Sequence, residues 1–190
     1  MSQIGSPISA GHGTFFVTLS PDDLYAYVTT WGGSAPTNML LKFRTSDMTL
    51  IGSAPTGVDP LSVVISPDGL YAYVVNRTSF TLQKFRTTDM IQIGDNIKTG
   101  NYPLSIDISP DGLYVYVVNA GSNTLQKFST TTMTQVGSNT VTGSSPHFVD
   151  LSPDGLYAYI VNMGSDTLQK FNTNTMTQVG TNVSTGVQPI

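Results

Sequence analysis

Apolar and polar residues alternate in short runs along the chain, and turn-forming residues separate these runs. In residues 113–119, the aliphatic Leu113 and Val115 alternate with Tyr114 and Tyr116, so an extended segment would carry apolar or aromatic side chains on both faces. A sheet built from such strands must be covered on both sides. The pattern therefore predicts short β-strands stacked between neighbouring sheets.

Within residues 103–143, the same reasoning places four strands. They are expected at residues 104–108, 113–119, 124–128 and 134–137, with the last two more polar and nearer to water. The segment Ser109-Pro110-Asp111-Gly112 separates the first two strands. Pro presets the turn backbone, Ser and Asp accept hydrogen bonds, and Gly tolerates a positive φ. We therefore interpret the aspartate as part of the turn and not as a metal ligand or a catalytic acid.

This segment recurs along the whole chain. The turn begins at Ser20, Ser66, Ser109 and Ser152, with spacings of 46, 43 and 43 residues. Phenylalanines on the expected third strand keep the same phase at Phe43, Phe85, Phe128 and Phe171. A period in the low forties made of strands and turns is typical of β-propeller blades, which have about four strands each.

The predicted fold is all-β, a β-propeller of four-stranded antiparallel blades with four repeats in the chain. Residues 1–190 are interpreted as one domain in which residues 1–15 and 176–190 duplicate an outer-strand segment. The repeats could close as a four-bladed ring, pair as an eight-bladed ring from two chains, or form part of something larger. We slightly prefer the second, because a swapped outer strand would cover an open sheet edge. A homodimer or higher homo-oligomer through the termini is thus expected.

The second strand carries a family resemblance. Tyr73-Val74-Val75-Asn76 and its equivalents at residues 116–119 and 159–162, each behind Ser-Pro-Asp-Gly, resemble the repeat of the YVTN-type β-propellers. The first copy departs, with Asp23 in place of the turn glycine and Thr30 in place of the final asparagine. The resemblance implies a propeller from a family found in surface-layer proteins, lactonase-like enzymes and cofactor-bearing oxidoreductases. It does not choose among these functions.

Composition excludes several classes of protein. The chain has a formal net charge of -4, no cysteine, and aspartate as its only acidic residue. The acidic balance argues against nucleic acid as a partner, and no apolar run is long enough to span a membrane. The abundance of Thr, Ser and Asn predicts little helix and favours an extracellular or cell-surface setting, although the first residues lack the pattern of a secretory signal. No cofactor is expected.

Candidate binding residues lie in the loops on one face of the predicted propeller, where the repeats differ most. Residues before the inner strands are His12, Asp59, Tyr102 and Ser145, and residues after the second strands are Trp31, Arg77, Ala120 and Met163. Arg77, Asp59 and Tyr102 could offer a guanidinium, a carboxylate and a phenol to one ligand at the channel mouth. Trp31 could stack on a sugar or anchor a partner, or pack over its own blade. Relaxed constraint on exposed loops would also explain the variation.

The two histidines, His12 and His147, both precede an inner strand. Closure of the ring would make their blades neighbours, and Asp107 or Asp150 could assist a metal there. Transition-metal sites usually require three or four ligands, so no metal site is expected. For the two aspartates we expect a hydrogen bond to Tyr or Ser across a blade interface.

Four lysines recur on the third strand, at Lys42, Lys84, Lys127 and Lys170. They are interpreted as a solubilising ring that protects the sheet edges.

These patterns favour a non-catalytic module that binds a protein or a glycan through the variable loop face with Trp31, Asp59, Arg77, Tyr102, His147 and His12. No nucleophile elbow, phosphate loop or metal-ligand spacing is present, so the sequence predicts that the chain is not an enzyme. Two alternatives stay open. One is a lactonase-like hydrolase with a His and Asp site at the channel mouth, and the other is a structural subunit that assembles through its ends.

Overall fold

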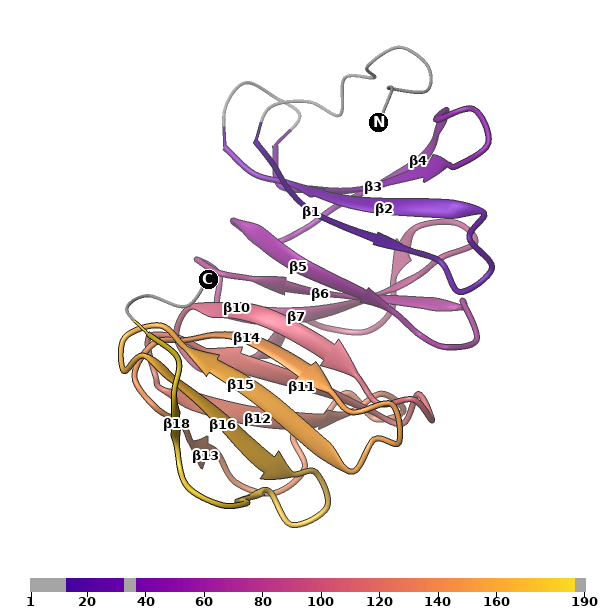
Figure 1. Ribbon diagram of the computed structural model, residues 1–190. Helices are drawn as coiled ribbons and strands as arrows, with labels where there is room; N and C mark the ends of the chain where they lie inside the picture. The colour runs from indigo at the N-terminus through magenta and orange to yellow at the C-terminus, as the bar shows by residue number, and fades with distance from the viewer. Residues whose placement is uncertain (1–12, 33–36, 187–190) are drawn as a thin grey trace, which may run out of the picture.

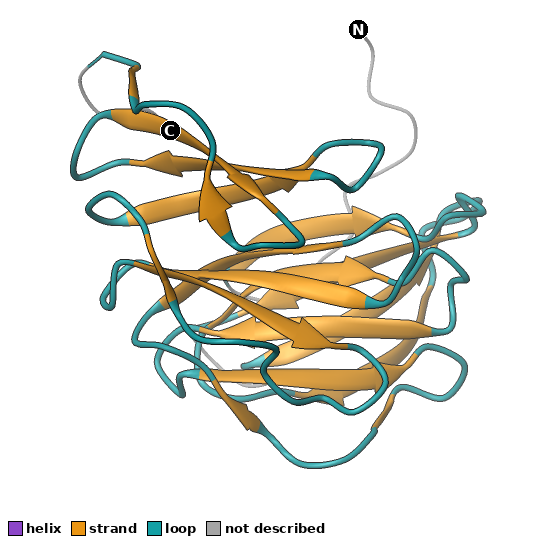
Figure 2. Cartoon of the chain, turned by 90° about the horizontal axis from the view of Figure 1, so that it is seen from below, coloured by secondary structure: helices purple, strands orange, loops and turns teal. Residues whose placement is uncertain are grey.

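The computed structural model describes residues 13–32 and 37–186 of the chain (Figure 1). These residues contain strands, turns and loops but no helix (Figure 2), and the strands form four antiparallel sheets. The predicted all-β, blade-based fold is confirmed. His12 and most of the expected duplicated segments, residues 1–12 and 187–190, lie outside the described residues.

Each sheet is one blade, and its strands follow the chain from the inner to the outer edge. Blade 1 comprises β1–β4, blade 2 β5–β9, blade 3 β10–β13 and blade 4 β14–β18. The inner strands are β1 (Thr14–Leu19), β5 (Pro60–Ile65), β10 (Pro103–Ile108) and β14 (Pro146–Leu151). The second strands are β2 (Tyr25–Thr30), β6 (Tyr71–Asn76), β11 (Tyr114–Asn119) and β15 (Tyr157–Asn162). The third strands are β3 (Met39–Arg44), β7 (Thr81–Arg86), β12 (Thr124–Ser129) and β16 (Thr167–Asn172). The outer segments are β4 (Leu50–Pro55), β8 (Ile91–Gln92), β9 (Ile97–Lys98), β13 (Thr140–Val141), β17 (Thr177–Gln178) and β18 (Val183–Ser184).

The turn between the first two strands is held by its own side chains, as the sequence predicts. The Ser109 hydroxyl donates to the Asp111 carboxylate at 2.5 Å, and the Leu113 N–H donates to the same oxygen at 2.9 Å. These bonds favour the ionised form and lower the pKa of Asp111. Gly112 supplies the positive φ of 72°. The aspartate therefore closes the hairpin and positions the second strand.

The outer edge of the blades differs from the sequence-based expectation. A strand is predicted at residues 134–137, but the structure has a single bridge between Phe128 and Gln135 followed by β13. Gly137 turns the chain there with a φ of 76°, which interrupts regular strand pairing. Blade 1 has an unbroken β4 because Gly52 does not adopt a positive φ.

The four blades form an open arc in which each packs against the next. Inner strand β5 contacts β1 on one side and β10 on the other, and β10 contacts β14. Blades 1 and 4 lie at opposite ends of the arc (Figure 1). Within the described residues, the first and last blades therefore do not become neighbours as closure of a four-bladed ring would require. Of the two histidines, only His147 lies among the described residues.

An apolar core fills each interface between consecutive blades. From blade 2, Tyr73, Val75 and Leu82 pack against Ile106, Val115, Val117 and Phe128 of blade 3. The equivalent side chains form the cores between blades 1 and 2 and between blades 3 and 4. Each inner blade is thus apolar on both faces, as the alternation of residues along its second strand predicts.

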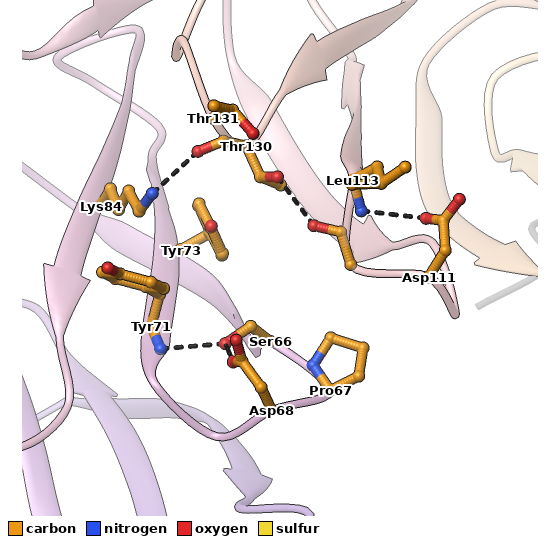
Figure 3. A pocket seen from close by; sticks show the side chains of 11 residues that line it. Ser66, Pro67, Asp68, Tyr71, Tyr73, Lys84, Asp111, Leu113, Thr130 and Thr131 are labelled. Atoms are coloured by element: carbon orange, nitrogen blue, oxygen red, sulfur yellow. Dashed lines mark hydrogen bonds between the residues drawn. The ribbon is translucent and has the colours of Figure 1, made fainter.

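Three of the repeated lysines, Lys42, Lys84 and Lys127, are buried inside these interfaces, so the interpretation of the lysines as an exposed solubilising ring is wrong. The buried Lys84 ammonium donates to the Thr130 carbonyl of the next blade at 2.8 Å and lies 4.0 Å from the centre of the Tyr71 ring (Figure 3). Lys42 and Lys127 make the same bond to the following blade. Burial lowers the pKa of Lys84 and raises that of Tyr73 to about 12. The lysine therefore joins two blades.

Asp107 also crosses a blade interface, although its partner is backbone and not the expected Tyr or Ser. Its carboxylate accepts the Leu151 N–H of blade 4 at 2.7 Å and the Ile108 N–H at 2.8 Å. Burial raises the pKa of Asp107 despite these bonds. Asp150, the equivalent residue of blade 4, is exposed.

Replacing Lys84 with Met tests the role of the lysine between blades. The variant keeps the apolar stem but leaves the Thr130 carbonyl without its donor, so we expect a loss of about 1–3 kcal/mol in the free energy of unfolding. Urea denaturation followed by circular dichroism measures this loss. The exposed Lys98→Met variant is the control and should unfold like the parent protein. Equal stability of the two variants would contradict a structural role for the buried ammonium.

Candidate functional site

The loops opposite the Ser-Pro-Asp-Gly turns bring the variable residues of each repeat together in pairs. In every blade, the residue after the second strand donates its N–H to the carbonyl of the residue before the inner strand. The pairs are Trp31 with Gly13 at 2.9 Å, Arg77 with Asp59 at 2.8 Å, Ala120 with Tyr102 at 2.9 Å, and Met163 with Ser145 at 2.9 Å. The same backbone bond therefore presents different side chains in each blade.

The residues before the inner strands adopt a backbone conformation that side chains usually avoid. Asp59, Tyr102 and Ser145 have φ values of 56°, 52° and 49°, and Gly13 has the same conformation in blade 1. Left-handed residues other than glycine are uncommon and are often found where binding residues must be aimed. This conformation fixes the direction in which Asp59 and Tyr102 leave the backbone.

Arg77 is the centre of a group that includes three of the predicted residues. Its guanidinium Nη2 lies 3.5 Å from the Asp59 carboxylate, and its centre lies 5.8 Å from the middle of the Trp31 ring. The Thr78 hydroxyl donates to the same Asp59 carboxylate. The buried Arg77 Nε has no hydrogen-bond partner among the described residues. The Arg77 side chain is 40% exposed, so its terminal guanidinium nitrogens can donate to an anionic or carbonyl group from solution.

A cavity of about 290 Å³ lies beside this group. It is lined by Arg77, Tyr102, Leu104, Ala120, Gly121 and Ser145, so it is built by blades 2, 3 and 4. The half-exposed Tyr102 packs edge-on against Phe80, with ring centres 5.2 Å apart. The structure therefore places Arg77 and Tyr102 on one cavity, while Asp59 and Trp31 lie against Arg77 and do not line it.

His147 lies at the start of β14, two residues after the cavity residue Ser145. Its ring is half-buried against Phe148, and its Nδ1 has no hydrogen-bond partner within the described chain. Burial lowers the pKa of His147 below its ordinary value of 6.5, so the imidazole is neutral near pH 7. A neutral imidazole can accept a proton.

Three further hollows lie at the opposite end of the blades. Their volumes are about 510, 440 and 380 Å³, and each lies between two consecutive blades. Figure 3 draws the hollow of about 510 Å³, with Lys84, Tyr71 and Tyr73 facing the turn residues Ser66 and Asp68. Because the same residue types line all three, these hollows follow from the packing of the repeats. The loop-face cavity has a lining that no other blade pair reproduces.

Two contributors to the site were not identified from the sequence. A Cβ added to Gly121 would lie 2.5 Å from Tyr102 Cδ2, so only glycine lets the phenol ring lie across this loop. Phe80 supports the other side of the same ring. Phe80 departs from the repeat, since Asn38, Asn123 and Asp166 stand at the equivalent positions, and this departure is a signal that the sequence offered.

The described residues contain no cluster of three or more potential metal-ligating His, Cys, Asp or Glu side chains. In the same residues, no helix has the length and apolar character needed to cross a membrane.

The chain is similar to enzymes and to other propellers of known structure. Residues 21–135 match the model of a family described as "Lactonase, 7-bladed beta-propeller". No curated protein gives a significant match. This family match corrects the expectation that the chain is not an enzyme, because the matched family is named for a hydrolytic activity.

Solved structures share the fold at low sequence identity. Hydrazine synthase of Kuenenia stuttgartiensis matches with a TM-score of 0.79 and 23% identity, over 97% of this chain and 53% of that chain. A protein of Bacteroides uniformis, provisionally named a 6-phosphogluconolactonase, matches with a TM-score of 0.77 and 20% identity, over 92% and 56%. Its counterpart from Bacteroides fragilis gives 0.69 and 21%, over 92% and 55%. The chain thus spans about half the length of these proteins.

The contact between Gly121 and Tyr102 can be tested by a double-mutant cycle. Gly121→Ala should lower the free energy of unfolding by about 1–3 kcal/mol, because the added methyl group displaces the Tyr102 ring. In a Tyr102→Ala background the same change should cost clearly less, with a coupling of at least about 0.5 kcal/mol. Thermal and urea unfolding of the four proteins measures both values. Additive effects would mean that the ring does not lie against Gly121.

Proposed function

We propose that this protein takes part in lactone hydrolysis at its loop face, because the chain belongs to the lactonase family of seven-bladed β-propellers. The observation that supports this location is the cavity between Arg77 and Tyr102, with His147 close to it in sequence. The chain spans about half of the solved lactonase-like propellers, so the proposal concerns the part of the site that this half contributes.

Arg77 is suited to bind an anionic substituent of the substrate. A guanidinium offers several donors in a plane and matches the oxygens of a phosphate or carboxylate. Asp59 forms an ion pair with the Arg77 guanidinium at 3.5 Å, and the centre of the Trp31 ring lies 5.8 Å from that guanidinium. These two contacts position Arg77. Two solved relatives are provisionally named 6-phosphogluconolactonases. We therefore propose a phosphorylated sugar lactone as the substrate class.

The reaction needs a base, a stabiliser of negative charge and a proton for the leaving group. In the proposed mechanism, the neutral His147 imidazole takes a proton from water as the oxygen attacks the lactone carbonyl carbon. The Tyr102 hydroxyl donates a hydrogen bond to the oxyanion that forms. The bond between the acyl carbon and the ring oxygen then breaks, and the imidazolium returns its proton to that oxygen. The products are a hydroxyl group and a carboxylic acid, which releases its remaining proton to water at neutral pH.

The finer assignment of the repeats to the YVTN type is also part of this proposal. It is supported by the Tyr-Val-Val-Asn segments at the ends of β6 and β11, each behind a Ser-Pro-Asp-Gly turn. Among the functions that this resemblance allows, the family match favours the hydrolase.

A comparison of charged and uncharged lactones tests the role of Arg77. We expect Arg77→Met to reduce kcat/KM for 6-phosphogluconolactone by about 10²-fold, since a charged hydrogen-bonding partner of the phosphate is lost. Hydrolysis of glucono-δ-lactone should change much less. Arg44→Met is a matched control, because Arg44 also pairs with an aspartate, Asp47, but lies on the third strand of blade 1. An equal loss with both lactones would contradict phosphate binding by Arg77.

The pH profile tests His147 as the base. Because burial lowers its pKa, the neutral form persists below pH 6.5, and activity should decline only as pH falls through this lowered value. His147→Gln should lower kcat by about 10²–10⁴-fold and remove this acid limb. Initial rates measured from about pH 4.5 to about pH 8, the range over which histidine titrates, test both effects. An unchanged acid limb in the variant would assign the proton transfer to another group.

A further inference from the structure

The three hollows between consecutive blades share one set of side chains that the proposed hydrolysis does not use. Each hollow combines a turn aspartate from each of the two blades, a lysine and two tyrosines from the earlier blade, and a leucine from the later blade. Volumes of about 380 to 510 Å³ are in the size range of small-ligand sites. Each hollow is therefore large enough for one small molecule.

The lysine brings an ammonium with unused donors to each hollow. Lys84 is 8% exposed, and its ammonium donates to the Thr130 carbonyl at 2.8 Å. An ammonium has three N–H donors, and no ion pair joins Lys84 to an aspartate within the described residues. The buried Lys42 and Lys127 repeat this arrangement in the other two hollows. A buried charge of this kind favours a ligand that supplies acceptor oxygens.

The turn aspartates bring a carboxylate to the same space. In Asp68, Oδ1 accepts the Ser66 hydroxyl at 2.5 Å and the Leu70 N–H at 2.9 Å, so Oδ2 can accept a further donor. These bonds, together with the nearby lysine charge, lower the pKa of Asp68 and keep its carboxylate ionised near pH 7. Asp22 and Asp111 have the same two bonds in the other two hollows. Each hollow therefore offers a donor and an acceptor that are not paired with one another.

An exposed leucine lines each hollow. Leu70, Leu113 and Leu156 directly follow the Ser-Pro-Asp-Gly turns and are 49%, 51% and 45% exposed. Their backbone is fixed, as the Leu113 carbonyl shows by accepting the Thr130 N–H at 3.0 Å. An apolar side chain beside an ammonium and a carboxylate matches a ligand that has both C–H and hydroxyl groups.

The charges of the hollows disfavour anions. Two carboxylates and one ammonium leave each hollow with a net negative charge. A phosphate or carboxylate group would therefore meet like charges. A hydroxyl group, by contrast, can accept from the ammonium and donate to the carboxylate at the same time. The set of groups thus favours a neutral ligand with several hydroxyl groups.

We propose that each hollow between consecutive blades binds one neutral hexopyranose, whose hydroxyl groups bridge the lysine ammonium and the turn carboxylate while its C–H groups contact the leucine. The protein then has one saccharide site per blade interface, at the opposite end of the blades from the loop-face cavity. This inference is independent of the proposed lactone hydrolysis. Several equal sites also suit a glycan chain, because one polymer can occupy more than one of them.

Methyl NMR of the leucines tests the sites without reference to activity. Titration with the methyl glycosides of mannose, galactose and glucose should shift the Leu70, Leu113 and Leu156 signals saturably for at least one of these sugars. The signals of Ile91, which is 53% exposed on an outer strand and lines none of the three hollows, should not move. The anionic 6-phosphogluconate should leave the leucine signals unchanged. No saturable shift with any of the three glycosides, or equal shifts with 6-phosphogluconate, would overturn the proposal.

The variant Asp22→Asn tests the role of the carboxylate. Of the three hollows, Asp22 lines only the one between blades 1 and 2, and asparagine keeps an oxygen for the turn bonds. The affinity reported by Leu70 should fall about tenfold, while the affinities reported by Leu113 and Leu156 stay the same and show that the fold is intact. Asp47→Asn is the matched control, since Asp47 also accepts an N–H in a turn of blade 1 but lines none of the three hollows. Equal affinities at Leu70 in the parent and Asp22→Asn proteins would contradict the proposed site.

An immobilised polysaccharide of the sugar that binds separates two sources of the ligand. Retention of the protein that is competed by the free glycoside supports a glycan as the source. Saturable shifts of the leucine signals without retention support the free sugar.

Discussion

The arrangement depends on one constraint, that a blade with apolar side chains on both faces needs a neighbour on each side. The second strands impose it, because Tyr73 and Val75 point to one face while Ala72 and Val74 point to the other, and all four are buried. Burial of such surface is the main favourable term in folding. A lysine also crosses each interface, and its ammonium always donates to the following blade. This bond makes the two faces of a blade different, so the blades all stack in the same orientation. The row of blades and the unlike character of its two ends both follow.

The same uniformity explains why the proposed chemistry is assigned to the loop face. The Ser-Pro-Asp-Gly turns, the lysines and the tyrosines recur because every interface needs them, so the hollows that they line recur too. At the other end, one backbone bond in each blade fixes the loops without using the side chains. These positions can therefore vary without loss of the fold. Arg77 and Tyr102 occupy two of these variable positions. The left-handed backbone of Tyr102 directs its ring toward Phe80.

The sequence predicts the features that are local or periodic. The strand order and the hairpin role of Asp111 follow from the repeat and its turns. Comparison of the repeats also identifies Arg77 and Tyr102 as variable loop residues, and the structure shows that they line one cavity. Features that depend on the next blade are not predictable in this way. From the sequence, Lys84 is typical of a surface residue, and its burial follows only from its hydrogen bond to the Thr130 carbonyl of the next blade. Similarly, the requirement for glycine at position 121 follows only from the position of the Tyr102 ring. The prediction that the chain is not an enzyme is also wrong. The loop residues form no contiguous catalytic motif, so only the family match corrects this prediction.

The central claim, that the loop face around Arg77 binds the substrate, can be tested through the single tryptophan of the chain. Trp31 lies 5.8 Å from the Arg77 guanidinium, so a ligand on Arg77 should alter its fluorescence. Titration with 6-phosphogluconate, the product of the proposed reaction, should give a saturable change that gluconate does not give and that Arg77→Met abolishes. Binding of 6-phosphogluconate by calorimetry without any change at Trp31 would contradict the account and place the site elsewhere.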